Sequence, residues 1–301
     1  MSFVKRIYHI HEKQPLFVFL MRELNITQGE AQRMIDRGRV SISGKIIKDK
    51  SLVAKGEIEI TVFEPHSILG APVFSTDKFM VFEKPSGVLV HPKTMQTPHS
   101  MLDEVRYYGG FKANAVHRID KETSGLLLAS RDKQAEKFLK SSFENRTIKK
   151  KYRAWVRGRI ESAFSVNQPI RLNRDYSECK HKAMISASGK AALTDFVPLY
   201  YDKDRDATLL ECTPHTGRTH QIRLHLFHVK HSILGDPLYG TDFEIAEKYL
   251  EERLTESERL RYTGAPRLML HAYSLEFYFA NRFHIVSRND FFREIERIWE
   301  E

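Results

Sequence analysis

The chain has 301 residues, a length that accommodates about two domains. Its hydrophobic fraction of 41% is enough to build a core and argues against a disordered chain. Lys and Arg number 48 against 39 Asp and Glu, so the formal charge is +9 and a polyanionic partner such as nucleic acid is favoured. Charge alone does not separate RNA from DNA or from an acidic membrane surface.

No stretch of the chain predicts a membrane or secreted protein. The N-terminus lacks the long apolar run of a signal peptide, and the run Pro15 to Met21 is too short to cross a bilayer. Cys179 and Cys212 lie far apart and form no Cys-x-x-Cys pair, so neither a disulfide framework nor a cysteine metal site is indicated. We therefore predict a cytoplasmic, monomeric protein with two reduced, buried thiols.

The first predicted element is a short helix over residues 15 to 24. Its apolar residues fall on one helical face, and they are Leu16, Phe17, Phe19, Leu20 and Leu24. Pro15 suits the first turn of this helix, where a backbone N–H has no partner in any case.

A second helix is predicted to begin near Gln28. Thr27 and Glu30 match a capping box, in which each side chain satisfies a free N–H at the helix start. Gly38 is placed to end this helix in a left-handed conformation. The apolar side of the helix consists of Ala31, Met34 and Ile35.

Two short strand regions follow, marked by the alternating residues Val40 and Ile42 and then by Ile58, Ile60 and Val62. Between residues 33 and 50 six basic residues face only two acidic ones, which favours phosphate binding through counterion release. Two short helices followed by Gly-Arg-Val-Ser-Ile-Ser-Gly-Lys-Ile-Ile resemble the S4 RNA-binding module. The alternative is a solvated basic face on a small α+β domain.

The richest segment for chemistry is His-Arg-Ile-Asp-Lys-Glu-Thr-Ser-Gly-Leu-Leu-Leu, residues 117 to 128. An arginine, a carboxylate and two hydroxyls here run directly into an apolar strand. Taken alone, Asp120 and Thr123 are most simply explained as turn formers that bond nearby backbone N–H groups. Ser124-Gly125 lacks the Gly-x-Ser-x-Gly context of a serine hydrolase.

Four further segments accompany this one in order. The first two are Lys84-Pro-Ser-Gly87 and Lys150-Lys-Tyr-Arg-Ala-Trp-Val-Arg-Gly158. The third, Thr213 to Gly240, contains the runs Thr-Gly-Arg-Thr-His-Gln-Ile-Arg and Gly-Asp-Pro-Leu-Tyr-Gly. The fourth is Arg267-Leu-Met-Leu-His-Ala. Together the five segments resemble the RluA-type pseudouridine synthases over about residues 75 to 280. The resemblance implies an α+β fold, with a mixed, largely antiparallel central sheet flanked by helices, beside the small S4-like domain.

The resemblance also implies three catalytic roles. Asp120 would attack a uridine so that its base is detached, turned and rejoined through carbon. Tyr152 would pack on the flipped base, where stacking typically contributes about 1–3 kcal/mol, and take part in proton handling. Arg223 would pair with Asp120 and keep it ionised. The competing interpretations are an ordinary half-buried strand tyrosine and a surface arginine paired with another acid.

Further residues are assigned to RNA binding. Arg118 contacts RNA or fills the gap left by the flipped base. Arg218 and Thr219 sit at a helix entrance suited to phosphate, beside His220. In the front module we expect Arg33, Arg37 and Lys45 to contact RNA.

Two features fit the resemblance less directly. Five histidines crowd residues 215 to 231, but without a His-Glu-x-x-His pattern or a nearby cysteine we predict no zinc site. Residues 243 to 261 predict a packed surface helix, with a protein contact as the alternative. The net charge of −2 makes this segment a poor phosphate binder. Its apolar side would consist of Phe243, Ala246, Tyr249, Leu250 and Leu254.

These observations predict an S4-like domain over residues 1–66, a linker over 67–74 and a pseudouridine synthase domain over 75–301. The leading hypothesis is a stand-alone RNA-uridine isomerase without metal or redox cofactor, with ribosomal RNA of the large subunit as the favoured partner. A transfer RNA enzyme and a non-catalytic RNA-binding ribosome-assembly factor are the alternatives. DNA binding is least favoured, since no helix-turn-helix or zinc-finger pattern is present.

Overall fold

The computed structural model describes residues 2–173 and 183–300, and it divides into two compact units. The front unit runs up to Ser67 and includes Pro92–His99, while the large unit contains Ile68–His91 and the chain from Ser100 onward. No helix of the described residues is long and apolar enough to cross a membrane. Cys212 is buried and free, whereas Cys179 lies outside the described residues.

The front unit packs two helices on a four-stranded antiparallel sheet of order β1-β4-β2-β3. Its elements in chain order are β1 (Phe3–Pro15), α1 (Leu16–Leu24), α2 (Gln28–Asp36), β2 (Val40–Ile42), β3 (Lys45–Ile46) and β4 (Val53–Phe63). One apolar core joins both helices to the sheet, and it includes Leu16, Leu20, Ile35 and Ile58.

Most sequence predictions for this unit are confirmed. Both halves of the capping box between Thr27 and Glu30 are formed, and α2 begins at Gln28. Gly38 has a φ of +67°, the left-handed conformation expected after this helix. The long strand β1 was not predicted, because polar and charged residues fill most of its positions and it pairs along only one edge, with β4.

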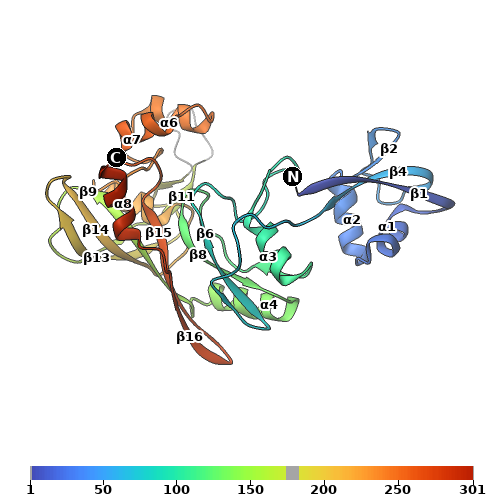
Figure 1. Ribbon diagram of the computed structural model, residues 1–301, viewed down its shortest axis with the longest axis horizontal. Coiled ribbons are helices and arrows are strands. Elements are labelled where there is room, and N and C mark those ends of the chain that lie inside the picture. The colour runs from blue at the N-terminus through green and yellow to red at the C-terminus, as the bar shows by residue number, and fades with distance from the viewer. Residues whose placement is uncertain (1, 174–182, 301) are drawn as a thin grey trace. The chain divides into compact units, whose positions relative to one another are not determined.

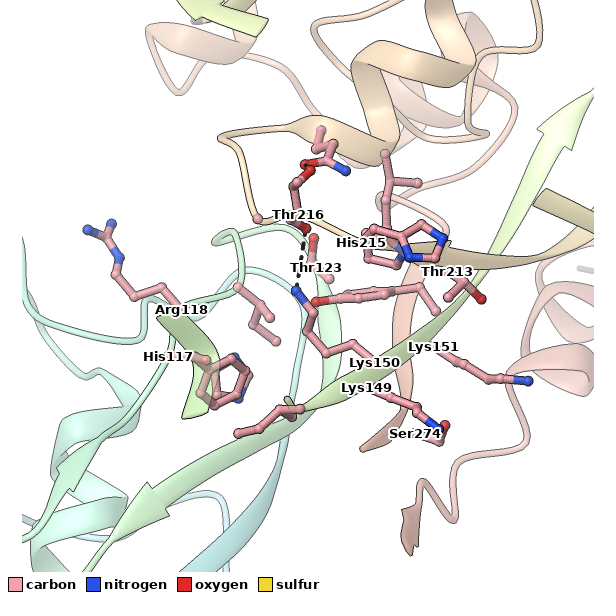
Figure 2. A pocket seen from close by; sticks show the side chains of 18 of the residues that line it. His117, Arg118, Thr123, Lys149, Lys150, Lys151, Thr213, His215, Thr216 and Ser274 are labelled. Atoms are coloured by element: carbon pink, nitrogen blue, oxygen red, sulfur yellow. Dashed lines mark hydrogen bonds between the residues drawn. The ribbon is translucent and has the colours of Figure 1, made fainter. Parts of the chain in front are cut away.

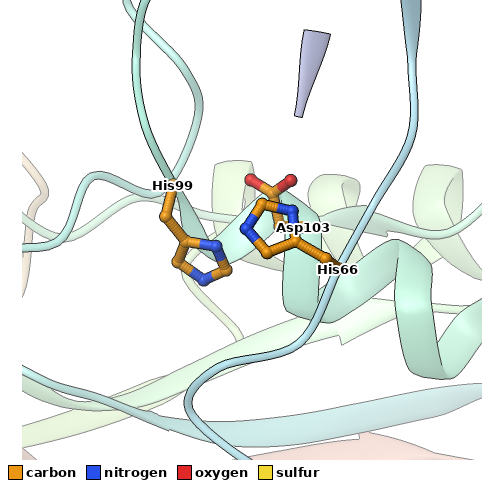
Figure 3. Close-up of side chains that lie close together, drawn as sticks. All are labelled: His66, His99 and Asp103. Carbon is orange, nitrogen blue, oxygen red and sulfur yellow. The ribbon is translucent and has the colours of Figure 1, made fainter. Parts of the chain in front are cut away.

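Residues 92–99 come after the first strands of the large unit but pack with the front unit. There the imidazole of His99 meets that of His66 edge-on, with ring centroids 5.1 Å apart (Figure 3). In the large unit, Asp103 accepts hydrogen bonds from the Ser100 N–H and Oγ, both at 2.9 Å, and caps the start of α3 (Met101–Gly109).

The large unit is built on a ten-stranded sheet (Figure 1). Its main path is β10-β13-β14-β9-β15-β8-β6-β5, with β16 paired to β15 and β7 to β8. The strands are β5 (Phe74–Ser75), β6 (Phe79–Lys84), β7 (Asn114–Ala115), β8 (Ser124–Ser130), β9 (Lys149–Arg157), β10 (Phe164–Asn167), β13 (Leu193–Asp202), β14 (Ala207–Pro214), β15 (Leu270–Phe279) and β16 (Asn281–Val286). A small sheet pairs β11 (Ile170–Leu172) with β12 (Ala183–Ile185).

Helices flank this sheet. Besides α3 they are α4 (Lys133–Glu144), α5 (Gln221–His228), α6 (Phe243–Leu250), α7 (Glu256–Thr263) and α8 (Phe291–Glu300). Among the described strands of the ten-stranded sheet, β15 and β8 pair in parallel, while the other pairs are antiparallel. The predicted α+β fold with a mixed, largely antiparallel central sheet is therefore confirmed.

Two core clusters meet at the middle of the sheet. One surrounds Trp155 on β9 and Phe196 on β13, and the other surrounds Phe82 on β6 and Leu127 on β8. Tyr152 packs against both clusters. The middle of β9 is thus the place where the two halves of the large unit join.

The single helix predicted over residues 243 to 261 is wrong. Two helices, α6 and α7, occupy this segment, because Glu252 adopts a left-handed φ of 57° and Thr255 begins a new capping box with Glu258. The predicted apolar side is also wrong in part: Phe243 and Leu250 are exposed, whereas the buried residues of α6 are Ile245 and Ala246.

Strand β15, which contains the end of the quoted segment Arg267-Leu-Met-Leu-His-Ala, lies at the centre of the sheet between β9 and β8. The hairpin partner β16 and the helix α8 follow it, and neither was predicted. Phe291 and Ile295 of α8 are fully buried in the core cluster around Trp155.

Candidate active site

The predicted nucleophile, Asp120, lies on the loop that leads into β8. This loop can approach β15 only because of Gly125, which has a φ of +106° and pairs with Ala272. A Cβ atom at Gly125 would lie 2.4 Å from the backbone oxygen of Ala272, so any other residue would push the two strands apart. Thr123 closes the turn through its N–H, which donates to the backbone oxygen of Asp120 at 3.2 Å.

Lys84, at the end of β6, is hydrogen-bonded to the Asp120 loop. Its fully buried Nζ donates to the backbone oxygens of Pro85, Val88 and Lys121 at 2.8, 2.8 and 2.9 Å. Burial lowers the pKa of Lys84 to about 7, and the carboxylates of Glu122 and Asp120 oppose that fall. A buried lysine with three carbonyl partners is a strong constraint on the position of the loop.

The carboxylate of Asp120 faces two cationic or potentially cationic groups. Its Oδ2 lies 3.8 Å from Nη1 of Arg223 and 3.8 Å from Nε2 of His220. Arg223 is almost completely buried, while the Asp120 side chain is 31% exposed. The carboxylate is therefore open to a ligand on one side and close to a fixed positive charge on the other.

Arg223 is oriented by a second carboxylate. Its Nε and Nη2 donate to Asp236 Oδ2 and Oδ1, both at 2.7 Å, in a bidentate pair. Burial opposes ionisation of Asp236, but the charge and hydrogen bonds of Arg223 outweigh it and hold the pKa of Asp236 below its usual value. The bidentate pair leaves Nη1 as the atom of Arg223 nearest Asp120.

The turn that carries Asp236 is also tightly built. Gly235 has a φ of +74°, and a Cβ there would lie 1.7 Å from the backbone oxygen of Arg267. Asp236 Oδ1 accepts the N–H groups of Leu238 and Tyr239. The Tyr239 hydroxyl in turn lies 2.9 Å from Nδ1 of His220, so the same turn positions both groups that face Asp120.

Tyr152, the predicted stacking residue, is half-buried on β9 opposite Cys212 of β14. Burial raises the pKa of its hydroxyl well above the usual value, and the negative charge of Asp120 adds to this. The phenol therefore stays protonated at neutral pH. Its position between the two core clusters gives the ring a rigid support, which a stacking surface requires.

Asp120, Tyr152 and Arg223 line one cavity of about 1330 Å³, all of it within the large unit. Eight Lys and Arg residues line this cavity against four Asp and Glu residues, so its net charge is positive. Figure 2 shows Lys149, Lys150 and Lys151 along one strand, with Lys150 reaching toward Thr216, whose backbone oxygen its Nζ contacts at 3.4 Å. A basic cavity with a central carboxylate suits a nucleic acid ligand.

The residues predicted to bind RNA are placed differently from one another. Arg118 is exposed at the cavity, and Arg218 and His220 also line it. Thr219 is half-buried and is not part of the lining. Arg33, Arg37 and Lys45 are exposed side chains of the front unit.

Four of the five clustered histidines have separate partners. His215 bonds to Asp195, His220 to Tyr239, His225 to Thr194 and the backbone of Gln168, and His231 to the backbone of Arg157. Burial lowers the pKa of His225, as expected for a neutral core histidine. Different structural roles thus account for these four side chains.

Several residues of the site were not singled out from the sequence. Asp236 stood in a quoted motif without a role, although a buried aspartate after a glycine turn is a plain candidate for an arginine partner. The lysines of β9 carried a visible signal, a run of three basic residues at the start of a strand. Lys140 and Arg146 also line the cavity, but no local pattern separates them from solvated surface charge.

Comparison with known proteins places this site in a family. Residues 78–228 match the family model described as RNA pseudouridylate synthase. An uncharacterised RNA pseudouridine synthase of Helicobacter pylori is 38% identical over 280 residues, which cover 93% of this chain and 91% of that protein. The ribosomal large subunit pseudouridine synthase D of Zymomonas mobilis is 32% identical over 238 residues, covering 71% and 73% of the two chains.

Among solved structures, the human RNA pseudouridylate synthase domain containing 1 superposes with a TM-score of 0.59 at 25% identity. The match covers 78% of this chain and 90% of the human one. The fold and the sequence agree on a class of RNA-modifying isomerase. The chain belongs to the RNA pseudouridine synthase family, whose members convert uridine to pseudouridine in RNA.

Proposed function

We propose that this enzyme is an RluA-type synthase that modifies ribosomal RNA of the large subunit, with Asp120 as its nucleophile. The observation that carries the proposal is the position of Asp120, partly exposed in a basic cavity and 3.8 Å from a buried arginine. The name of the Zymomonas mobilis relative supports the choice of RNA.

In the proposed reaction a uridine leaves its stack and enters the cavity, where the ring of Tyr152 supports the base. The carboxylate of Asp120 attacks the nucleotide, the bond from the sugar to N1 of the base breaks, and the base turns. A bond then forms from the sugar to C5, the bond between Asp120 and the nucleotide breaks, and the carboxylate is regenerated. C5 loses its proton and N1 gains one. Substrate and product are isomers, so this balance requires no oxidant or reductant.

Arg223 contributes by keeping a positive charge beside Asp120 during these steps. Both the charge of Asp236 and that of Asp120 raise the pKa of Arg223, although burial opposes the rise. The arginine therefore stays charged throughout the pH range of the reaction. Because Asp236 fixes its orientation, Arg223 serves as a preorganised group, which costs little reorganisation when charge moves on Asp120.

For the front unit we propose an S4-like RNA-binding domain over residues 1–66, with residues 67–74 as a linker and 75–301 as the synthase domain. Support comes from the exposed Arg33, Arg37 and Lys45, which lie on α2, just after it and at the start of β3. Exposed basic residues of this kind bind phosphates and release counterions. Monomeric state and cytoplasmic location stay predictions from the sequence.

The test combines cells and purified protein. Pseudouridines are mapped by carbodiimide primer extension in ribosomal and transfer RNA from cells with and without the gene. The gene is then restored as wild type, Asp120→Ala or Asp77→Ala, the last being a control at an aspartate whose side chain is 83% exposed. We expect a mark in large-subunit RNA that is restored by the wild type and by Asp77→Ala but not by Asp120→Ala.

Two results would contradict the proposal in different ways. A lost mark confined to transfer RNA would overturn the choice of ribosomal RNA and leave the nucleophile standing. Full restoration by Asp120→Ala would remove Asp120 from the reaction. The rate of pseudouridine formation is then measured directly on the affected RNA fragment with purified wild-type protein and the same two variants.

A further inference from the structure

We propose that Arg259, on α7, is a positioning residue that ties the Asp120 loop to the turn carrying Asp236. This inference rests on the proposed function of Asp120. It assigns a role to the acidic segment α6–α7, which the charge pattern excluded as a phosphate binder and which the proposed reaction does not use.

The guanidinium of Arg259 contacts both sides of the site. Its Nη1 lies 2.8 Å from Oε2 of Glu122, and its Nη2 and Nε donate to the backbone oxygen of Gly235 at 2.7 and 3.1 Å. The side chains of Arg259 and Glu122 are only 12% and 9% exposed. A shielded charge pair of this kind is less weakened by solvent than a surface ion pair.

Both contacts of Arg259, with Glu122 and with Gly235, are close in sequence to residues of the proposed active site. Glu122 lies two residues after Asp120 on the same loop. Gly235 precedes Asp236, whose carboxylate orients Arg223 through two hydrogen bonds. One planar guanidinium thus sets the spacing between the loop of the proposed nucleophile and the turn that aims its cationic partner.

A second residue of the segment supports the same contact. The hydroxyl of Tyr249, on α6, donates to Oε1 of Glu122 at 3.0 Å. Burial, and then the charge of Glu122, raise the pKa of this hydroxyl well above its usual value, so it remains a donor at neutral pH. Both carboxylate oxygens of Glu122 are therefore held from the α6–α7 segment.

The segment is itself anchored where Arg259 needs it. The Gly235 N–H donates to the backbone oxygen of Thr263 at the end of α7, at 2.9 Å. The Thr263 hydroxyl donates to the backbone oxygen of Arg259 at 2.6 Å. At the other end of α7, Glu258 lies 3.4 Å from Lys248 of α6. The two helices thus contact each other, and α7 is hydrogen-bonded to the Gly235 turn.

This arrangement separates positioning from RNA binding. Arg259, Tyr249 and Glu122 are not part of the cavity lining, so a base held in the cavity should not contact them. Their loss should slow the chemical step without weakening the complex with RNA. A shift of about 1 Å in a reacting group is enough to cost about 100-fold in rate.

The experiment measures single-turnover pseudouridine formation at saturating enzyme, RNA affinity and melting temperature for four variants. These are Arg259→Gln, Arg259→Lys, Glu122→Gln and the double variant Glu122→Gln/Arg259→Gln. Arg261→Gln serves as the matched control, since Arg261 is an exposed arginine of the same helix. The full-length protein is used throughout, with an RNA that carries its mapped uridine.

We expect Arg259→Gln to slow the single-turnover rate by about 10- to 100-fold while RNA affinity changes less than about twofold. Arg259→Lys should recover part of the rate, because one ammonium reaches Glu122 or Gly235 but lacks the fork that reaches both. The double variant should be no slower than the slower single variant, as contacting residues are not additive. Arg261→Gln should match the wild type.

A wild-type rate in Arg259→Gln, a loss that lies entirely in RNA affinity, or equal losses in Arg259→Gln and Arg261→Gln would each overturn the inference. If Arg259→Gln does not fold, Tyr249→Phe carries the test, since it removes one hydroxyl and keeps the ring. A three- to tenfold slower rate is then expected on the scale of one lost hydrogen bond, and an unchanged rate overturns the inference. Inactive wild-type protein, or an active Asp120→Ala, would instead defeat the proposed function.

Discussion

The Asp120 loop and the basic surface of the front unit both carry charges, but they are constructed in opposite ways. Around the loop, the groups that hold it are buried and bonded on several sides, as with Lys84, Glu122 and Asp236. On the front unit, Arg33 and Arg37 are exposed on and just after α2. The buried charges fix the positions of the groups around Asp120, whereas the exposed charges contribute to the electrostatic potential of the surface.

The two constructions differ in what their loss costs. Removing one partner of a buried ion pair typically costs about 3–5 kcal/mol, because the remaining charge is left without compensation. An exposed charge pair contributes about 0–1 kcal/mol, since water and salt replace the partner. Variants around the loop should therefore have large effects on rate and stability, and variants on the front unit small ones that depend on salt.

Among the variants that test this contrast, the largest effect is expected for Asp236→Asn. This change keeps the acceptor for the Leu238 and Tyr239 N–H groups but removes the charge that orients Arg223. We expect the arginine to move toward Asp120, with a fall of about 100-fold in single-turnover rate and a loss of about 3 kcal/mol in unfolding free energy. Rapid-quench kinetics and denaturant unfolding measure the two.

Asp242→Asn is the matched control, because Asp242 is an exposed aspartate six residues further along the chain. It should leave both quantities unchanged. If Asp236→Asn were as active and as stable as Asp242→Asn, the buried ion pair of Asp236 would contribute no more than an exposed charge, and the comparison would be contradicted.

Elements with local signals were predictable from the sequence. The capping box at Thr27 sets the start of α2, and alternation in Ile58, Ile60 and Val62 marks β4. The same capping signal is present at Thr255 and Glu258, and reading it there separates α6 from α7. The helical spacing of apolar residues across 243–261 concealed it, because periodicity alone does not register a break between two short helices.

Contacts that depend on tertiary structure were not predictable in the same way. Tyr249 and Glu122 are 127 residues apart, and nothing local to either indicates the other. Lys84 stood in a quoted segment without a role of its own, yet its three carbonyl partners come from its own loop and from Lys121 on the Asp120 loop. Motif spacing selected Asp120, Tyr152 and Arg223 as candidates, and the fold shows that these three line one cavity.

A smaller effect is expected for the double variant Arg33→Gln/Arg37→Gln. Each arginine that neutralises a phosphate contributes about one unit to the slope of log affinity against log salt, so the slope should fall by about two. RNA affinity should weaken most at low salt, while the single-turnover rate at saturating enzyme stays the same. Filter binding across a salt series measures the slope.

Lys13→Gln/Lys55→Gln removes the same charge from two exposed lysines of the same unit, on β1 and β4. This control separates a specific RNA surface from general attraction. A similar loss of slope in both double variants would mean that the basic surface around α2 has no special place in RNA binding, and the front unit would then contribute only its overall charge.

The smallest effect on the reaction itself is expected for Glu83, on β6, which does not line the cavity. Its carboxylate accepts a hydrogen bond from Ser287 at 2.9 Å and lies 3.3 Å from His271. Burial raises the pKa of Glu83 to about 6, although the Ser287 hydrogen bond opposes the rise. A carboxyl with a raised folded-state pKa contributes stability that is complete below its unfolded pKa of about 4.5 and is lost as pH rises through 6.

Glu83→Gln imitates the protonated carboxyl at every pH, so the variant should be more stable than the wild type at pH 8 by about 2 kcal/mol, with the difference vanishing near pH 4.5. Thermal melts at the two pH values measure this. Glu57→Gln, at an exposed glutamate of β4, should change neither melt. A Glu83→Gln variant that is less stable than the wild type at pH 8 would mean that the charged form of Glu83 is stabilised by its neighbours. The contrast between buried and exposed carboxylates would then not extend to β6.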